Sequence, residues 1–89
     1  MAAILIGSCT VTLVSPMAGM DFWTVVAPST ADADDTIDVS TIVDTIYDVT
    51  NTSASDGLVQ STATTAGVVD LKGSTANEAR TVYIWGKKA

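Results

Sequence analysis

The sequence predicts an all-β protein, a small antiparallel β-sandwich or barrel of about seven short strands that forms a single domain over residues 1–89. Threonine, valine and isoleucine supply 31 of the 89 residues, and β-branched side chains favour extended strands. Glutamate, which helices use heavily, occurs once, as Glu78. Turn signals recur at roughly the 8–12-residue spacing of sandwiches and barrels.

The first predicted strand spans residues 3–14, and Ser15-Pro16 ends it because proline cannot donate to a strand ladder. Its second half alternates threonines with apolar residues, as a half-buried strand does. One face is predicted to carry Leu5, Gly7, Cys9, Val11 and Leu13. The other face is predicted to carry Ile4, Ile6, Ser8, Thr10, Thr12 and Val14.

A loop over 17–21 leads into a second strand over 22–26, which Pro28 closes. Two methionines and two aromatic residues gather around this corner: Met17, Met20, Phe22 and Trp23. Such side chains are enriched in the cores of protein interfaces. The corner is therefore a candidate interface, and the alternative, that it caps the domain's own core, stays open.

After an acidic loop over 28–35, a short strand is expected at 36–39. The next segment is ambiguous, because Ile42, Val43, Ile46 and Val49 have helical spacing and Ser40 could cap a helix. We favour a turn at 40–42 and a strand over about 43–52, since the segment is rich in β-branched residues. One face of this strand would then hold Val43, Thr45, Tyr47 and Val49.

The dipeptide Asp56-Gly57 predicts a hairpin with a type I′ turn, which joins the strand near 43–54 to one at 58–64. Ala66-Gly67 leads into a strand at 68–71, and the last strand is 80–86. In the last strand Val82 and Ile84 face one way, and Thr81, Tyr83 and Trp85 face the other. Because both faces are largely apolar, this strand belongs centrally or under an intersubunit contact. The final four strands are predicted to form an antiparallel meander.

The charge balance excludes several classes of partner. The net charge is -6, and the cations are Lys72, Arg80, Lys87 and Lys88. Nucleic acids and anionic membranes both need many basic contacts, so we expect neither as a partner. The sequence also holds no run of 18 apolar residues that could span a bilayer.

The inventory of reactive side chains argues against an enzyme. Histidine is absent and cysteine occurs once, which excludes Ser-His-Asp chemistry, Cys-His chemistry and multi-cysteine zinc sites. We therefore expect no catalytic residues, no metal and no cofactor. The lone Cys9, on the apolar face of the first strand, is expected to pack as a small hydrophobe.

Three polar motifs could carry a function, and for each of them we favour a structural interpretation. Asp32, Asp34 and Asp35 could ligate calcium, but the EF-hand glycine and glutamate are replaced by Ile37 and Val43, so a solvated loop is favoured. Asp38, Asp44 and Asp48 could be catalytic carboxylates, but we favour outward-facing charges that keep strand edges from pairing wrongly. The glycosylation sequon Asn51-Thr52-Ser53 is taken as accidental.

Ile6-Gly7-Ser8-Cys9 is similar to a lipoprotein cleavage site, but no basic residue precedes it and the apolar run is too short for a signal peptide. We therefore interpret this segment as a β-strand that begins near residue 3. Hydrophobic residues make up 47% of the chain and charged residues 16%. A domain this small cannot bury so much apolar surface, so we expect self-association or docking onto a larger assembly.

Two strand segments and the closing segment carry a family resemblance: Asp35-Thr36-Ile37-Asp38-Val39-Ser40, Thr45-Ile46-Tyr47-Asp48-Val49, and residues 70–87 with Val82-Tyr83-Ile84-Trp85-Gly86-Lys87. Over 35–87 the chain resembles the capsid decoration or cement proteins of tailed bacteriophages. The resemblance implies a virion protein, made in the host cytoplasm, that binds the major capsid protein as a dimer or trimer and stabilises the shell. It implies no catalytic residues. Such proteins often have a long N-terminal arm before the first strand, which this sequence lacks, so the mode of attachment is left open.

The expected interface residues are Met17, Met20, Phe22, Trp23, Tyr83 and Trp85, together with backbone pairing at strand edges. The alternative function is a β-sandwich binding module, an adhesin or carbohydrate-binding domain of a surface or tail appendage. A flat row of exposed tryptophan and tyrosine would favour that alternative.

Overall fold

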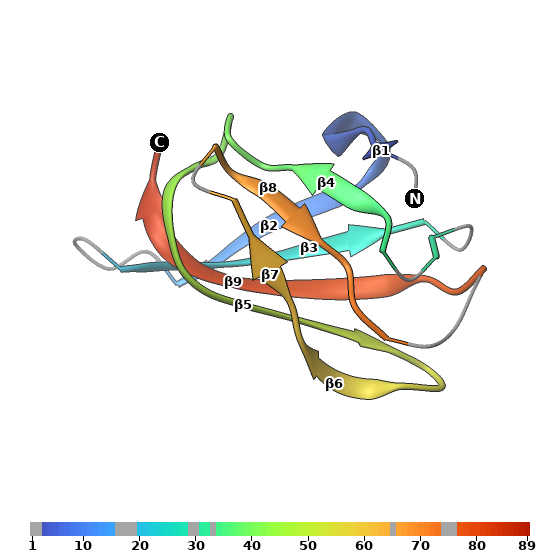
Figure 1. The fold of residues 1–89 in the computed structure, drawn as a ribbon. Coiled ribbons are helices and arrows are strands. Elements are labelled where there is room, and N and C mark those ends of the chain that lie inside the picture. Colours follow the sequence, from blue (N-terminus) through green and yellow to red (C-terminus); the bar gives the residue numbers. More distant parts are fainter. Residues whose placement is uncertain (1–2, 16–19, 29–30, 33, 65, 74–76) are drawn as a thin grey trace.

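The computed structural model describes residues 3–15, 20–28, 31–32, 34–64, 66–73 and 77–89. It confirms the all-β class: within these residues nine strands form two sheets that pack face to face (Figure 1). The helical content of the described part of the chain is one turn of 3-10 helix, η1 (Ile6–Ser8).

The larger sheet has five strands, all antiparallel to their neighbours, in the order β2-β3-β9-β5-β6. Their bounds are β2 (Thr10–Ser15), β3 (Asp21–Ala27), β9 (Arg80–Lys88), β5 (Val43–Ser53) and β6 (Gly57–Gln60). The last strand of the chain, β9, lies at the centre of this sheet, as its two apolar faces predicted.

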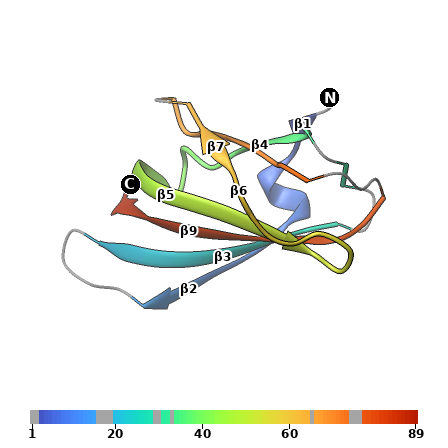
Figure 2. The same cartoon turned by 60° about the horizontal axis from the view of Figure 1, so that its bottom comes forward.

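The smaller sheet has the order β1-β4-β8-β7. Its strands are β1 (Ala3–Ile4), β4 (Thr36–Asp38), β8 (Val68–Asp70) and β7 (Thr62–Ala63). The pair β1-β4 is parallel and the other pairs are antiparallel. Figure 2 views the sandwich from the side, with the smaller sheet above the larger one.

The prediction of one strand over 3–14 is wrong, because η1 interrupts it. The backbone N–H and the hydroxyl of Ser8 both donate to the carbonyl of Leu5, at 2.9 and 2.7 Å. This local turn redirects the chain, so β1 joins the smaller sheet and β2 joins the larger one.

The predicted strand over 58–64 also divides, into β6 and β7 of different sheets. Ser61 lies at the crossing, where its buried N–H donates to the carbonyl of Val49 at 3.1 Å. These two divisions turn seven predicted strands into nine. The predicted meander of the final four strands is also wrong, since β6 and β7 lie in different sheets and so do β8 and β9.

The preferred interpretation of 41–50 is confirmed: a turn precedes a strand. The N–H groups of Ile42 and Val43 both donate to the carbonyl of Val39 at 3.0 Å, and β5 starts at Val43. Its predicted face is wrong, however, because the pairing with β9 shifts register twice, between 43 and 45 and between 46 and 48. Each bulge adds a residue, so Val43 and Val49 are buried while Thr45 and Tyr47 are exposed.

The hairpin between β5 and β6 is confirmed, with a different turn. Ser53 pairs with Gly57, so three residues form the loop, and Gly57 has a φ of 70°. Among the described non-glycine residues positive φ values belong to Asp34 and Asn77, so Asp56 does not take the conformation that a type I′ turn requires.

The core lies between the sheets and is built from small and β-branched residues plus one tryptophan. Its buried members are Trp23, Val25, Ala27, Ala31, Ile37, Val39, Val43, Val49, Val69, Leu71, Val82 and Ile84. Close packing also requires a glycine at position 86, because a Cβ there would lie inside van der Waals contact of the Thr45 carbonyl oxygen and 2.8 Å from Val43 Cγ1.

A buried polar group closes the end of the sandwich next to the β5-β6 hairpin. The carbonyl of Lys72 accepts hydrogen bonds from Asn51 Nδ2 and from the Arg80 guanidinium, both at 2.9 Å. Asn51 Oδ1 accepts from the N–H of Lys72 at 3.1 Å and from the Ser61 hydroxyl. Arg80 also pairs with Asp56 at 3.5 Å. Buried polar groups need such partners, and together they tie the loop after β8 to β5 and β9 of the larger sheet.

Candidate interaction surface

The outer face of the larger sheet is set by alternation along β3 and β9. In this pair Phe22 lies opposite Trp85, and Thr24 lies opposite Tyr83. The residues between them in sequence point inward and are buried, whereas these four are half-buried or exposed. Since side chains alternate between the faces of a strand, the structure brings Phe22, Tyr83 and Trp85 together on the outside.

These three rings form a stacked cluster, which we call the aromatic face. The ring centroids of Phe22 and Trp85 are 4.4 Å apart with an interplanar angle of 25°. Those of Phe22 and Tyr83 are 6.2 Å apart with an angle of 8°. Phe22 therefore stacks on both β9 aromatics, and Trp85 keeps 36% of its surface exposed. Stacking fixes the rings relative to each other, so the cluster is preorganised for contact.

The aromatic face is surrounded by uncharged side chains. The register places these neighbours on the same outer face: Thr10, Thr12, Thr24, Thr45, Thr50, Thr52 and Thr81, with the apolar Val26 and Leu58. Asp48 and Lys87 are the charged residues that the described strands add to it. In Figure 2 no described segment lies below this sheet. The outer face is thus open and nearly neutral.

Asp48 is held in place on this face. Its Oδ1 accepts hydrogen bonds from Gln60 Nε2 at 2.8 Å and from the N–H of Val49 at 3.0 Å. Both Asp48 and Asp44 lie where β5 extends beyond β6 and bulges. Charges and bulges on an open edge discourage strand addition there.

The six predicted interface residues do not form one group. Phe22, Tyr83 and Trp85 lie together, and Met20 is exposed next to the start of β3. Met17 lies outside the described residues. Trp23 points to the opposite face of β3 and is 3% exposed, so of the two interpretations of the corner, this side chain follows the core one.

Sequence reasoning missed Val26 and Leu58, which extend the outer face. Val26 could have been predicted, because it continues the two-residue period of Phe22 and Thr24. That period pairs with the one that places Tyr83 and Trp85 on the same face of β9. Leu58 offered no comparable signal, since its face depends on the register of a four-residue strand.

The acidic loop uses its carboxylates within the fold. Asp35 Oδ2 accepts from the N–H of Asp32 at 2.9 Å, and Asp32 Oδ1 accepts from the N–H of Asn77 at 2.8 Å. Asp34 pairs with Lys72 at 3.2 Å. Among the described residues no three acidic or thiol groups gather as a metal site would require.

The remaining predicted motifs have structural partners. Hydrogen bonds from Ser40 lower the pKa of the exposed Asp38 carboxyl. Burial raises the pKa of the Cys9 thiol, with an opposing hydrogen bond from Ser8, and Cys9 packs against the core. Asn51 is fully buried, so the folded chain does not present the sequon.

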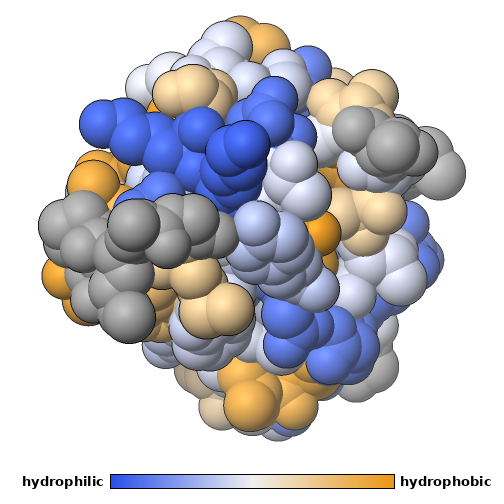
Figure 3. Space-filling view, turned by 90° about the vertical axis from the view of Figure 1, so that its left-hand side faces the viewer, coloured by the Kyte–Doolittle hydropathy of each residue, from blue (hydrophilic) through white to orange (hydrophobic). Residues whose placement is uncertain are grey.

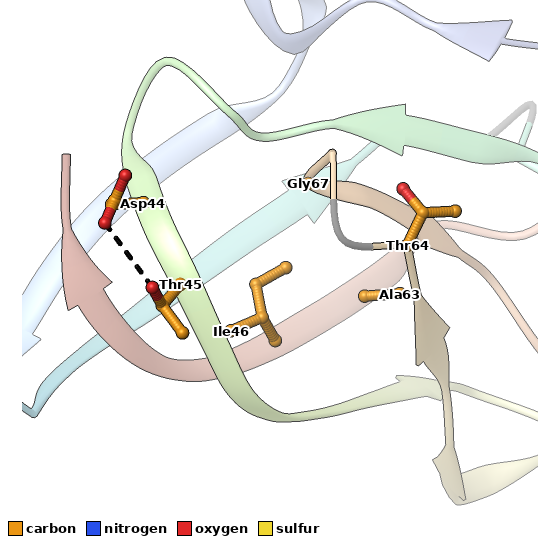
Figure 4. A pocket seen from close by; sticks show the side chains of 6 residues that line it. All are labelled: Asp44, Thr45, Ile46, Ala63, Thr64 and Gly67. Carbon is orange, nitrogen blue, oxygen red and sulfur yellow. Dashed lines mark hydrogen bonds between the residues drawn. The ribbon is translucent and has the colours of Figure 1, made fainter.

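A hollow of about 250 Å³ lies between β5 and the turn that joins β7 to β8 (Figure 4). Ile46 and Ala63 point toward each other across it, and Asp44 lies at its rim, where it accepts from the Thr45 hydroxyl at 3.4 Å. Figure 3 shows the end of the sandwich that carries the C-terminus, where small hydrophobic areas lie between hydrophilic ones. The lining of the hollow combines the apolar side chains of Ile46 and Ala63 with the threonines Thr45 and Thr64 and the carboxylate of Asp44.

Compared with known proteins, the chain matches no family model, no curated protein and no solved structure. The described residues contain no helix with the length and apolar character needed to cross a membrane. The outer face of the larger sheet is therefore interpreted from its own chemistry.

Proposed function

We propose that this protein is a structural subunit of a virus particle, a capsid decoration or cement protein that binds the major capsid protein and stabilises the shell. The observation that supports this most is the aromatic face, three stacked rings on an open sheet surface with few charges. Trp and Tyr are the residues that most often dominate binding energy at protein interfaces.

The outer face has the dimensions of a protein interface. Five strands about 4.8 Å apart, each contributing about seven residues of 3.3 Å rise, cover roughly 24 by 23 Å, or about 550 Å². A stable interface typically takes about 800 Å² from each partner. The sheet face would supply most of that area, and multiple copies on a symmetric shell would add avidity.

A carbohydrate-binding module is the second candidate, because Trp85 is exposed on the outer face of the larger sheet. Sugar stacking requires the free face of an aromatic ring. Here Phe22 stacks against both Trp85 and Tyr83, so ring faces are already used within the protein. This arrangement favours a protein partner, against which ring edges and neighbouring threonines pack equally well.

The test is co-sedimentation with assembled shells of the capsid protein encoded beside this chain, if the neighbouring reading frames encode one. Trp85→Thr introduces the residue that already dominates this face, so the sheet should still form. Losing a tryptophan hot spot of about 2 kcal/mol should weaken binding about 30-fold. Circular dichroism and the fluorescence of the buried Trp23 check that the variant folds.

Leu5→Thr is the matched control, since Leu5 is a strongly exposed apolar side chain in the segment between β1 and η1, outside the larger sheet. It should bind shells as the unmodified chain does. Equal loss in both variants, or full binding by Trp85→Thr, would refute docking through the aromatic face. Neighbouring frames without a capsid protein would count against the virion assignment. Fluorescence changes with neutral oligosaccharides that vanish in Trp85→Thr would favour the carbohydrate-binding alternative.

A further inference from the structure

We infer that the edge strand β2 is a self-association site, where two copies of this chain pair antiparallel and join their five-stranded sheets into one sheet of ten strands. Here β2 ends the strand order of the larger sheet, and no described strand pairs with its outer side. An edge strand directs alternate N–H and C=O groups away from its sheet, and these groups can bind another strand.

Side chains on β2 are open as well as the backbone. Val11 and Leu13 pair with the buried residues Val25 and Trp23 and share their inner face. Yet Val11 is 37% and Leu13 is 38% exposed. The smaller sheet therefore covers β3 but leaves β2 partly uncovered. A further strand beside β2 would cover these two apolar side chains.

The charge distribution favours a second copy as the occupant. The chain has a net charge of -6, so two copies repel each other over most of their surface. The segment 1–20, which contains β2, carries no charged residue. A contact between identical segments places like groups next to each other. Because this segment carries no charge, such a contact brings no like charges together.

The alternation of β2 is compatible with pairing to itself. Two copies keep their outer faces on the same side of a joined sheet only if residues of the same face lie opposite each other. A two-fold axis through Thr12 meets this condition and places Thr12 opposite its copy and Val11 opposite Leu13. Threonine pairs are favourable across strands, and the Val11–Leu13 pairs would shield two partly exposed apolar side chains from water.

The other open edges are less suited to pairing. At the opposite edge of the larger sheet, β6 has four residues, and the first of them, Gly57, has a φ of 70°. The free part of β5 carries two bulges and the aspartates Asp44 and Asp48. In the smaller sheet the edge strands β1 and β7 have two residues each. By contrast β2 is regular from Thr10 to Leu13 and bulges only between Leu13 and Ser15. This edge offers the longest regular pairing surface among these.

The site lies apart from the aromatic face and deepens the proposed function, since it names how the subunit self-associates before it docks. Symmetric disulfide formation tests it in a Cys9→Ser background, which removes the single native thiol. Thr12→Cys should cross-link into a covalent dimer, because opposite residues in an antiparallel pair lie about 4.5–5.5 Å apart at Cα, within disulfide range.

Thr10→Cys is the matched control, with the same residue type on the same face of the same strand. In the expected register its copy lies four residue rises away, about 13 Å, too far for a disulfide. Light scattering should give twice the chain mass for the uncross-linked protein. Thr12→Lys, which places two ammonium groups together, should weaken the dimer at least tenfold, while Thr62→Lys on β7 should not.

Equal cross-linking at Thr10 and Thr12, or a dimer that Thr12→Lys leaves intact, would overturn the pairing. A strict monomer at about 1 mM would overturn it too, and a monomer that still co-sediments with shells would leave docking through the aromatic face standing. A β2-paired dimer that does not co-sediment with shells would support the pairing and refute docking through the aromatic face.

Discussion

Gly86 provides a test of how closely β5 and β9 pack. Its Cβ position, if filled, would lie inside contact distance of the Thr45 carbonyl oxygen and 2.8 Å from Val43 Cγ1. The nearest atom belongs to the backbone, so a rotamer change cannot relieve the overlap. Gly86→Ala should therefore destabilise the fold, because β5 would have to move away from the central strand.

The sign of the effect separates two explanations of this glycine. Overpacking in a close-packed site costs about 1–3 kcal/mol. If Gly86 were only a flexible strand residue, alanine would instead stabilise by about 0.4–1 kcal/mol through the unfolded state. Its φ is not positive, so backbone strain does not contribute to the difference.

Urea unfolding followed by the fluorescence of buried Trp23 measures this effect. With a slope of about 1 kcal/mol per M for a small domain, the midpoint should fall by roughly 1–3 M. Gly7→Ala is the control, since nothing lies within 4 Å of that Cβ position, and its midpoint should move by less than about 0.5 M. A midpoint for Gly86→Ala equal to or above that of the unmodified chain would refute the packing argument.

Two further predictions concern titratable groups. Burial raises the pKa of the Cys9 thiol, so at pH 8 it should react with a disulfide reagent several-fold more slowly than the urea-unfolded chain does, and equal rates would contradict this. Hydrogen bonds to Asp70 and Asp34 raise the pKa of Lys72 above its usual value. These contacts therefore stabilise the fold while Lys72 is protonated, and the stabilisation is lost as pH rises through the pKa of Lys72. Asp70→Asn should lower that pKa in an NMR titration, while Asp38→Asn should leave it unchanged; no fall in Asp70→Asn would contradict the assignment.

Strand faces could be predicted where the two-residue period is unbroken. In β9 the alternation of Val82 and Ile84 with Tyr83 and Trp85 gave the observed faces. Prediction failed where one residue changes the local geometry. The hydrogen bonds of Ser8 create a turn inside an apparently continuous strand, and the N–H of Ser61 bonds across to Val49 as the chain changes sheets. These bonds depend on groups whose positions only the folded chain defines.

The candidate site was predictable to the same extent. Tyr83 and Trp85 share a face because they are two residues apart in a regular strand. Phe22 and Trp23 were grouped by adjacency, yet adjacent strand residues point to opposite faces. Trp23 is therefore core and Phe22 is surface. The stacking of Phe22 on Trp85 depends on the register between β3 and β9, which local sequence does not specify.

The central position of β9 has a consequence for biosynthesis. The strand of the larger sheet that is synthesised last, β9, lies between β3 and β5. Phe22 therefore pairs with a residue 63 positions later in the sequence, Trp85. Before Arg80–Lys88 leaves the ribosome, β3 and β5 have no common neighbour, and two-stranded pieces are marginally stable. Folding of the larger sheet should therefore be slow and should wait until β9 has been made. In that interval the nascent chain exposes the strand edges that chaperones protect.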